Sequence, residues 1–224
     1  MPMDLYYDPI SPPCRAVMLT CRALGLAVNV KKISLSTQDQ KKPEFLAINP
    51  QHTVPTIKDG DLRIWESRAI TTYLVNQYGK DDSYYPKDPK IRAKIDHLLY
   101  FDIGTLFGRF SEIVYPVMRG EVKEITPVKL NSIYETLGWL EGFLEGQKWA
   151  VGNHITVADF SLITSIQTLE LTKVNFKNYK NILKWKENCQ KEMKDYDDVC
   201  SEPLTVIGKL IQEKFSHVNL WKLT

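Results

Sequence analysis

The sequence predicts an α/β plus all-α architecture, with an α/β domain over residues 1–80 and an all-helical domain over residues 90–224. Short runs in which apolar and polar residues alternate, as they do in strands, occur in the first part. Apolar residues spaced three and four apart, as on the buried face of a helix, dominate the second part. Residues 81–89, which are mostly polar and contain two prolines, are the predicted linker.

The first elements are predicted from a short apolar run and a helix with both ends marked. Residues 5–7 are a strand candidate. Ser11 then precedes two prolines and an apolar stripe that Gly25 closes, so we expect a helix with an N-terminal cap and a C-terminal glycine. Residues 28–33 alternate like a half-buried strand, and residues 43–46 indicate a short helix.

Within residues 49–56, Pro50 and Pro55 bracket a polar tetrad, residues 51–54. Pro55 has no N–H to donate to a sheet, so it belongs at the first residue of a strand, at an edge or at a bulge. X-Pro bonds are the only ones that adopt the cis form at low cost. If the Val54–Pro55 bond is cis, the Val54 N–H and C=O face away from the sheet and can pair with another peptide backbone.

A hairpin and a helix follow this segment. Residues 56–58 and 62–65 flank Asp59-Gly60, which is the strongest hairpin signal in the chain. Glu66 and Ser67 read as the first turn of the next helix. A backbone edge beside a helix N-terminus suits a small peptide-like anion. An ordinary proline-bounded turn that leads into a hairpin is the alternative.

The second domain shows helical stripes and no convincing strand. Residues 91–114 predict a long helix that ends near residues 115–116, and residues 130–144 carry a second stripe. A capping box at residues 156–159, with Asp at its third position where Glu is usual, starts another helix. Residues 204–211 mark the last one.

The composition argues against several classes of function. The chain has 224 residues and a formal net charge of +2, with basic and acidic residues nearly balanced, so neither a nucleic-acid nor a membrane partner is expected. No apolar run approaches the ~20 residues that span a bilayer. The N-terminus lacks a secretion signal, and a cytoplasmic location is expected. The four cysteines form no Cys-x-x-Cys pair and the four histidines no His-x-x-x-His pair, so no metal site is expected.

Five short motifs occur along the chain. They are Ser-Pro-Pro-Cys-Arg at residues 11–15, Asn-Pro-Gln-His-Thr-Val-Pro at 49–55, Trp-Glu-Ser-Arg-Ala-Ile at 65–70, Leu-Tyr-Phe-Asp-Ile-Gly-Thr-Leu at 99–106 and Thr-Val-Ala-Asp at 156–159. A thioredoxin-like domain with a Val-Pro turn, followed by a helical bundle, looks like a cytosolic glutathione S-transferase. The motifs resemble the arthropod delta and epsilon classes in particular. The resemblance covers nearly the whole chain and implies glutathione as co-substrate and a homodimer.

Ser11 is the residue to which the resemblance assigns catalysis. Such a transferase must present glutathione as a thiolate near neutral pH, whereas a free thiol has a pKa near 8.5. Closing that gap takes about 2 kcal/mol, and one hydroxyl hydrogen bond to a charged sulfur contributes roughly 1.5–3 kcal/mol. The nearby helix N-terminus adds partial positive charge. A plain helix cap is the alternative role for Ser11.

Three residues near the first strand compete with Ser11. Tyr6 and Tyr7 end the strand, and other classes of the family use a tyrosine there, but core packing explains at least one of them. Cys14 stands at the second cysteine position of the Cys-Pro-x-Cys motif in thioredoxin-like redox proteins, whose attacking position is Ser11 in this chain. Thiol–disulfide exchange therefore lacks its nucleophile, and a buried structural thiol is expected for Cys14.

The resemblance also implies a glutathione-binding set. The backbone of Val54 would pair with the cysteinyl moiety, and Glu66 and Ser67 would hold the γ-glutamyl amine and carboxylate. His52 and Arg68 would face carboxylates. The predicted set is Gln40, His52, Thr53, Val54, Glu66, Ser67 and Arg68. Gln40 stands where the family usually has histidine, so we expect weaker glutathione binding, because an amide brings no positive charge.

The resemblance also implies an electrophile pocket between the two domains. Phe107, Phe110 and Tyr115 match positions that line this pocket in the family, and Ile207 or Ile211 could join them from the last helix. Core packing is the alternative for each. The predicted function is detoxification, in which glutathione attacks a hydrophobic electrophile or a peroxide. In the homodimer that the resemblance implies, Asp102 could reach the glutathione of the partner subunit. A carrier of hydrophobic ligands without catalysis is the alternative, and a thiol oxidoreductase would require Cys14.

Overall fold

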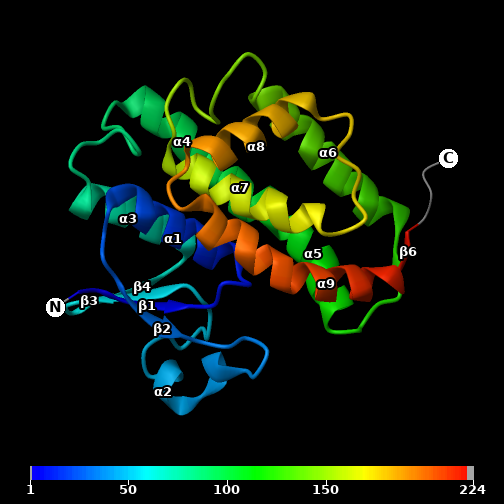
Figure 1. The fold of residues 1–224 in the computed structure, drawn as a ribbon, viewed down its shortest axis with the longest axis horizontal. Helices are drawn as coiled ribbons and strands as arrows, with labels where there is room; N and C mark the ends of the chain where they lie inside the picture. Colours follow the sequence, from blue (N-terminus) through cyan, green and yellow to red (C-terminus); the bar gives the residue numbers. More distant parts are fainter. Residues whose placement is uncertain (1, 221–224) are drawn as a thin grey trace.

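The computed structural model describes residues 2–220 as an α/β domain packed against a helical domain, which confirms the predicted fold class (Figure 1). The sheet of the first domain has the strand order β2-β1-β3-β4. The strands are β1 Asp4–Tyr7, β2 Asn29–Lys32, β3 Thr56–Asp59 and β4 Leu62–Trp65. Strand β1 runs parallel to β2, and β3 runs antiparallel to both β1 and β4.

Helices cover both faces of this sheet. Leu5 of β1 and Ile57 of β3 pair with each other and are fully buried. The helices of this domain are α1 Pro12–Leu24, the 3-10 turn η1 Asp39–Lys41, α2 Pro43–Leu46 and α3 Ser67–Tyr78. In Figure 1, α1 and α3 lie between the sheet and the helical domain, and α2 lies beyond the opposite face. The predicted hairpin, the short helix and both ends of α1 are confirmed, with Ser11 as N-cap and Gly25 at a φ of 65°.

Strand β2 differs from the expectation. The alternation of residues 28–33 predicts a half-buried strand, but the four residues of β2 are all exposed, and 46% of the surface of Val30 is accessible to solvent. The strand forms the edge of the sheet next to β1. The alternating pattern therefore predicts the extended backbone of this segment correctly but not its burial.

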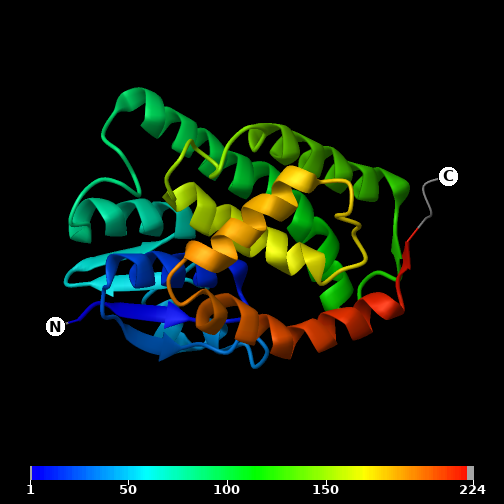
Figure 2. The same cartoon turned by 45° about the horizontal axis from the view of Figure 1, so that its top comes forward.

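The helical domain is built around α7. Its elements are α4 Pro89–Phe101, the π-helical turn η2 Asp102–Leu106, α5 Phe107–Met118, α6 Pro127–Phe143, α7 Val157–Glu170, α8 Lys180–Glu192, the π-helical turn η3 Asp197–Ser201 and α9 Glu202–Ser216. Residues 157–169 of α7 are all buried. Figure 2 shows α7 enclosed by neighbouring helices of its domain, and α1 packs against it across the domain boundary.

Three features of this domain escaped the sequence analysis. Residues 91–114 form two helices joined by η2 rather than one long helix, and the run continues past Pro116 to Met118. Helix α8 was missed because its apolar stripe is short. The expectation of no strand is wrong, because β5 Glu124–Ile125 pairs in parallel with β6 Asn219–Leu220. Two-residue strands are too short to show a periodic pattern.

Within residues 2–220, no helix combines the length and apolar character needed to cross a bilayer.

Candidate active site

The sheet register brings three predicted site segments to the same end of the strands. Thr56 at the start of β3 pairs with Tyr6 near the end of β1 and with Trp65 at the end of β4. The chain leaves β1 toward Ser11, enters β3 from Val54, and leaves β4 toward the start of α3. The β1–α1 connection, the proline-bracketed turn and the N-terminus of α3 are therefore neighbours.

Ser11 lies at the N-terminus of α1 with only 8% of its surface exposed. Its N–H donates to the Asp8 carbonyl at 3.1 Å, and its Oγ accepts a hydrogen bond from the Cys14 N–H at 3.4 Å. Capping uses a lone pair of the hydroxyl oxygen, so the hydroxyl proton can still be donated. The two roles considered for Ser11 are therefore compatible, since a single hydroxyl can cap α1 and hold an anion.

The competing residues are buried or turned toward other partners. Cys14 is fully buried, and burial raises the pKa of its thiol to about 12, so it stays protonated and poorly nucleophilic near neutral pH. Burial also raises the pKa of Tyr7, which has 8% of its surface exposed. Tyr6 packs edge-on against Phe45 of α2, with ring centroids 5.6 Å apart. The expected buried thiol at Cys14 is confirmed.

Asn49 fixes the proline-bracketed turn, a role that the sequence analysis did not assign to it. Its side chain is fully buried, and Nδ2 donates to the Thr53 carbonyl at 3.0 Å and to the Thr56 hydroxyl at 2.9 Å. The Val54–Pro55 peptide is cis, and the strand ladder begins only at Thr56. The backbone of Val54 thus lies outside the ladder. An asparagine directly before a proline in a predicted turn is the sequence signal that could have revealed this role.

The N-terminus of α3 holds a residue in an unusual conformation. Glu66 has φ 74° and ψ 99°, which is strained for a residue other than glycine. Such conformations cost on the order of 1–3 kcal/mol and cluster at ligand sites. Ser67, the first residue of α3, is 3% exposed. This outlier supports a binding role for the turn into α3.

Arg68 is held by a carboxylate of the helical domain. Its Nε donates to Asp102 Oδ2 at 3.0 Å, Nη2 forms a short ion pair with the same oxygen, and Nη1 donates to the Ser67 hydroxyl at 2.9 Å. Asp102 is fully buried and also accepts from the hydroxyls of Ser161 at 2.6 Å and Ser165 at 2.9 Å, both on α7. The glutathione-site candidates of α3 are thus anchored to η2 and α7.

These contacts change the interpretation of Asp102. The sequence suggests that it could reach the glutathione of a partner subunit, but both carboxylate oxygens are engaged inside its own chain. Its observed role is to orient Arg68. The two α7 serines are anchoring residues that the sequence analysis missed, because no local pattern relates them to a carboxylate about sixty positions earlier in the chain.

The three predicted aromatic residues gather beside Arg68. The ring centroids of Phe107 and Phe110 are 5.6 Å apart, and that of Tyr115 lies 6.3 Å from each. The Arg68 guanidinium carbon lies 5.2 Å from the Phe107 ring centroid. Phe110 is buried, whereas 40% of the surface of Tyr115 is exposed to solvent. An apolar aromatic surface therefore adjoins the candidate glutathione site.

The remaining candidates differ in exposure. His52 is exposed in a left-handed conformation with φ 46°, and Thr53 is exposed beside it. Gln40 lies in η1, and its buried Oε1 has no hydrogen-bond partner among residues 2–220. Ile207 and Ile211 lie on α9 with 9% and 1% of their surface exposed. Their part in a pocket wall stays a prediction.

Family comparisons match both domains. Residues 5–82 match the model of the glutathione S-transferase N-terminal domain, and residues 108–195 match that of the C-terminal domain. The chain belongs to the glutathione S-transferase family. Among solved structures, a delta-class glutathione transferase from Nilaparvata lugens is 41% identical with a TM-score of 0.90, and the match covers 95% of this chain and 100% of the other.

Two further transferase structures resemble this one over almost its full length. An epsilon-class glutathione S-transferase from the housefly, Musca domestica, is 36% identical with a TM-score of 0.89, covering 95% of this chain and 98% of the other. A glutathione transferase homologue from Drosophila mojavensis, solved with bound glutathione, is 35% identical with a TM-score of 0.88, covering 98% and 99%. The chain is thus similar to insect transferases of both classes.

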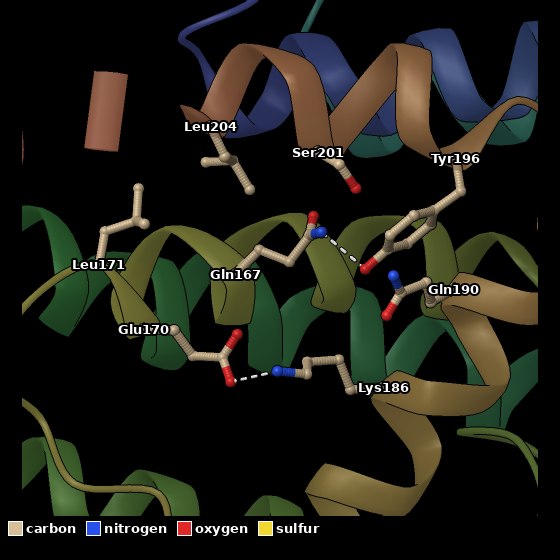
Figure 3. A pocket seen from close by; sticks show the side chains of 8 residues that line it. All are labelled: Gln167, Glu170, Leu171, Lys186, Gln190, Tyr196, Ser201 and Leu204. Atoms are coloured by element: carbon tan, nitrogen blue, oxygen red, sulfur yellow. Dashed lines mark hydrogen bonds and ion pairs between the residues drawn. The ribbon is translucent and has the colours of Figure 1, made fainter. Parts of the chain in front are cut away.

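A cavity of about 170 Å³ lies away from the candidate active site of this glutathione transferase. It opens between α7, α8 and α9, where Glu170 pairs with Lys186 and Gln167 donates to the Tyr196 hydroxyl (Figure 3). It shares no lining residue with the predicted site set. The cavity is therefore separate from the candidate active site.

Loss of the Asp102 charge should weaken glutathione binding more than turnover. In Asp102→Asn, Arg68 loses its charged partner and the start of α3 is no longer held, so we expect the KM for glutathione to rise about tenfold, equivalent to about 1.4 kcal/mol. Steady-state kinetics with glutathione as the varied substrate measure this. Glu135→Gln, which breaks the more exposed Arg109–Glu135 pair at 2.9 Å, is the matched control. Equal KM values for the two variants would contradict the role of Asp102.

Proposed function

We propose that this transferase conjugates glutathione to hydrophobic electrophiles through a thiolate that Ser11 stabilises. Two observations carry the proposal: the Ser11 hydroxyl caps α1, and the sheet register brings the β1–α1 connection to the same end of the strands as the turn of Val54 and the start of α3. A hydrogen bond to the charged sulfur lowers the pKa of a thiol, and the helix N-terminus acts in the same direction.

The proposed site assigns each part of glutathione to one segment. The Val54 backbone pairs with the cysteinyl moiety, Glu66 and Ser67 hold the γ-glutamyl end, and Gln40 with His52 faces the glycyl carboxylate. The sulfur then attacks the electrophilic atom of the second substrate, and a leaving group departs with the bonding electrons. Family membership and the transferase homologue with bound glutathione support glutathione as the co-substrate.

The aromatic group of Phe107, Phe110 and Tyr115 supports an apolar second substrate. Its rings lie beside Arg68 at the boundary between the domains. Aromatic side chains give a large, rigid contact surface with little loss of conformational entropy on binding. We propose apolar electrophiles as the substrate class and organic hydroperoxides as a second class. With a hydroperoxide, the thiolate would attack the terminal oxygen and break the O–O bond, which releases an alcohol and leaves a glutathione sulfenic acid. A second glutathione would then form a disulfide with that sulfur and release water. Location in the cytoplasm, a role in detoxification and a homodimer are further proposals, which family membership supports.

Turnover of a chlorodinitrobenzene substrate with glutathione tests this function. The purified chain is expected to catalyse the conjugation and to be retained on immobilised glutathione. A wild-type rate no higher than that of Ser11→Ala, with retention intact, would favour a carrier of hydrophobic ligands. A rate that depends on Cys14, measured with Cys14→Ala, would favour a thiol oxidoreductase.

Gln40 is expected to limit the affinity for glutathione. Its Oε1 is an acceptor without a partner in the described chain, and an amide offers no charge to a glycyl carboxylate. In Gln40→His, we expect the KM for glutathione to fall about threefold to tenfold below pH 6.5, where the imidazole is charged, and less above that pH. Gln51→His, in the neighbouring turn, is the control. A Gln40→His variant with an unchanged KM at every pH would contradict the assignment.

A further inference from the structure

Arg15 is a buried cation without an acidic partner. Its side chain is fully buried in the first turns of α1, four residues after Ser11. Buried charges are normally paired, because an isolated ion loses its hydration without compensation. None of the ion pairs among residues 2–220 includes Arg15.

The guanidinium instead bridges two parts of the molecule through neutral oxygens. Nη1 donates to the carbonyls of Pro9 at 2.9 Å and Ile10 at 3.2 Å, the two residues that precede Ser11. Nη2 donates to the Thr164 carbonyl at 3.3 Å and to the Thr168 hydroxyl, both on α7. The approach of the chain to Ser11 is therefore tied to the central helix of the other domain.

The titratable groups around Arg15 do not neutralise it. Tyr7 on β1, Cys14 on α1 and Cys200 on η3 face the guanidinium. Burial raises the pKa of all three, those of Cys14 and Cys200 to about 12, so they are uncharged near neutral pH. The Asp8 carboxylate forms no ion pair with Arg15 in the described chain and instead accepts hydrogen bonds from the N–H groups of Ile10 and Leu35. The positive charge of Arg15 thus has no counterion among these neighbours.

We propose that Arg15 is the positioning residue for Ser11. By holding the Pro9 and Ile10 carbonyls against α7, it fixes the direction in which the Ser11 hydroxyl points, and its unbalanced charge favours an anion beside that hydroxyl. The inference rests on the proposed function, in which the anion is the glutathione thiolate. An apolar side chain of similar length would fill the same space without the free-energy cost of desolvating a charge. Packing alone therefore does not explain why this buried residue is charged.

The pKa of the bound glutathione thiol distinguishes positioning from packing. It can be followed through the ultraviolet absorbance of the thiolate in the full-length chain, alongside kcat and the KM for glutathione. Arg15→Met removes the charge and both bridges, and Arg15→Lys keeps the charge but cannot span both sides. We expect Arg15→Met to raise the thiol pKa by about one unit and to lower kcat about tenfold near neutral pH. Arg15→Lys should produce a smaller change in the same direction, and the KM should change less than kcat in both.

Arg92→Met is the matched control. Arg92 of α4 also holds two backbone carbonyls, those of Tyr85 at 2.9 Å and Pro86 at 2.8 Å, but these lie between α3 and α4 and not beside Ser11. The Arg92→Met variant should have a lower melting temperature than the wild type but the same pKa for the bound glutathione thiol. Folded Arg15 variants whose thiol pKa equals that of the wild type would overturn the inference.

A milder variant keeps the test decisive if the Arg15 variants do not fold. Thr168→Val removes one acceptor on α7 and keeps the side-chain shape. A raised thiol pKa in Thr168→Val would support the inference, and an unchanged one would overturn it. A wild-type protein that binds glutathione without forming a thiolate would overturn the proposed function itself. If the pKa of the bound glutathione thiol is low in the wild type and equally low in every variant, the role of Arg15 is overturned while the proposed function stands.

Discussion

Replacing Ser11 by alanine is expected to raise the pKa of the bound glutathione thiol by about one to two units and to lower kcat/KM about tenfold to hundredfold near neutral pH. The hydroxyl hydrogen bond stabilises the charged form of the sulfur, so its loss moves the thiol toward its unperturbed pKa near 8.5. The defect should therefore be largest below pH 7 and shrink above pH 9, where the thiolate forms without help. A pH profile of kcat/KM measures both effects.

Thr126→Ala separates this chemistry from the loss of a helix cap. Thr126 caps α6 as Ser11 caps α1, since each side chain accepts from the backbone N–H three residues later, at 3.5 Å and 3.4 Å. Both substitutions should cost about 1 kcal/mol of stability. Only Ser11→Ala should change the pH profile. Parallel profiles for Ser11→Ala and the wild type would assign Ser11 to capping alone.

The largest loss of stability is expected from Asp159→Ala. The Asp159 carboxylate is fully buried and accepts hydrogen bonds from the Ala150 N–H at 2.8 Å, the Trp185 Nε1–H at 2.8 Å and the Thr156 N–H at 2.9 Å. Alanine leaves these buried donors unsatisfied, which should destabilise the fold by about 3–5 kcal/mol. The melting temperature should fall by roughly 10 °C, as measured by calorimetry or circular dichroism.

Asp88→Ala is the control for this prediction. Asp88 caps α4 by accepting from the Lys90 N–H at 3.0 Å and the Ile91 N–H at 2.9 Å, but it lies at the exposed surface. Water can replace those hydrogen bonds, so the loss should be about 1 kcal/mol. A melting temperature for Asp159→Ala no lower than that of Asp88→Ala would show that the capping box of α7 contributes little.

Local chemistry explains which elements could be predicted from the sequence. Ser11 and Gly25 mark the two ends of α1, and Asp59-Gly60 marks the turn between β3 and β4. Each of these positions needs a particular backbone conformation or cap that only a few residue types provide, so the residue type alone indicates the local structure. Burial depends on distant partners. The exposure of Val30 follows from the edge position of β2, which no local pattern reveals.

The same distinction applies to the candidate site. The Val-Pro turn and the start of α3 are continuous stretches of chain, so motifs could identify them. The anchoring of Arg68 by Asp102, Ser161 and Ser165 joins three separate elements, and the bridge from Arg15 to Thr168 spans both domains. Such contacts depend on tertiary packing and leave no spacing rule in the sequence.

A crystal structure of this protein with bound glutathione tests the central claim most directly. We expect the glutathione sulfur within about 3.5 Å of Ser11 Oγ, with the backbone of Val54 paired to the cysteinyl moiety and the γ-glutamyl end at Ser67. A sulfur atom well outside hydrogen-bond distance of Ser11, or a tripeptide bound elsewhere on the molecule, would contradict the proposed mechanism.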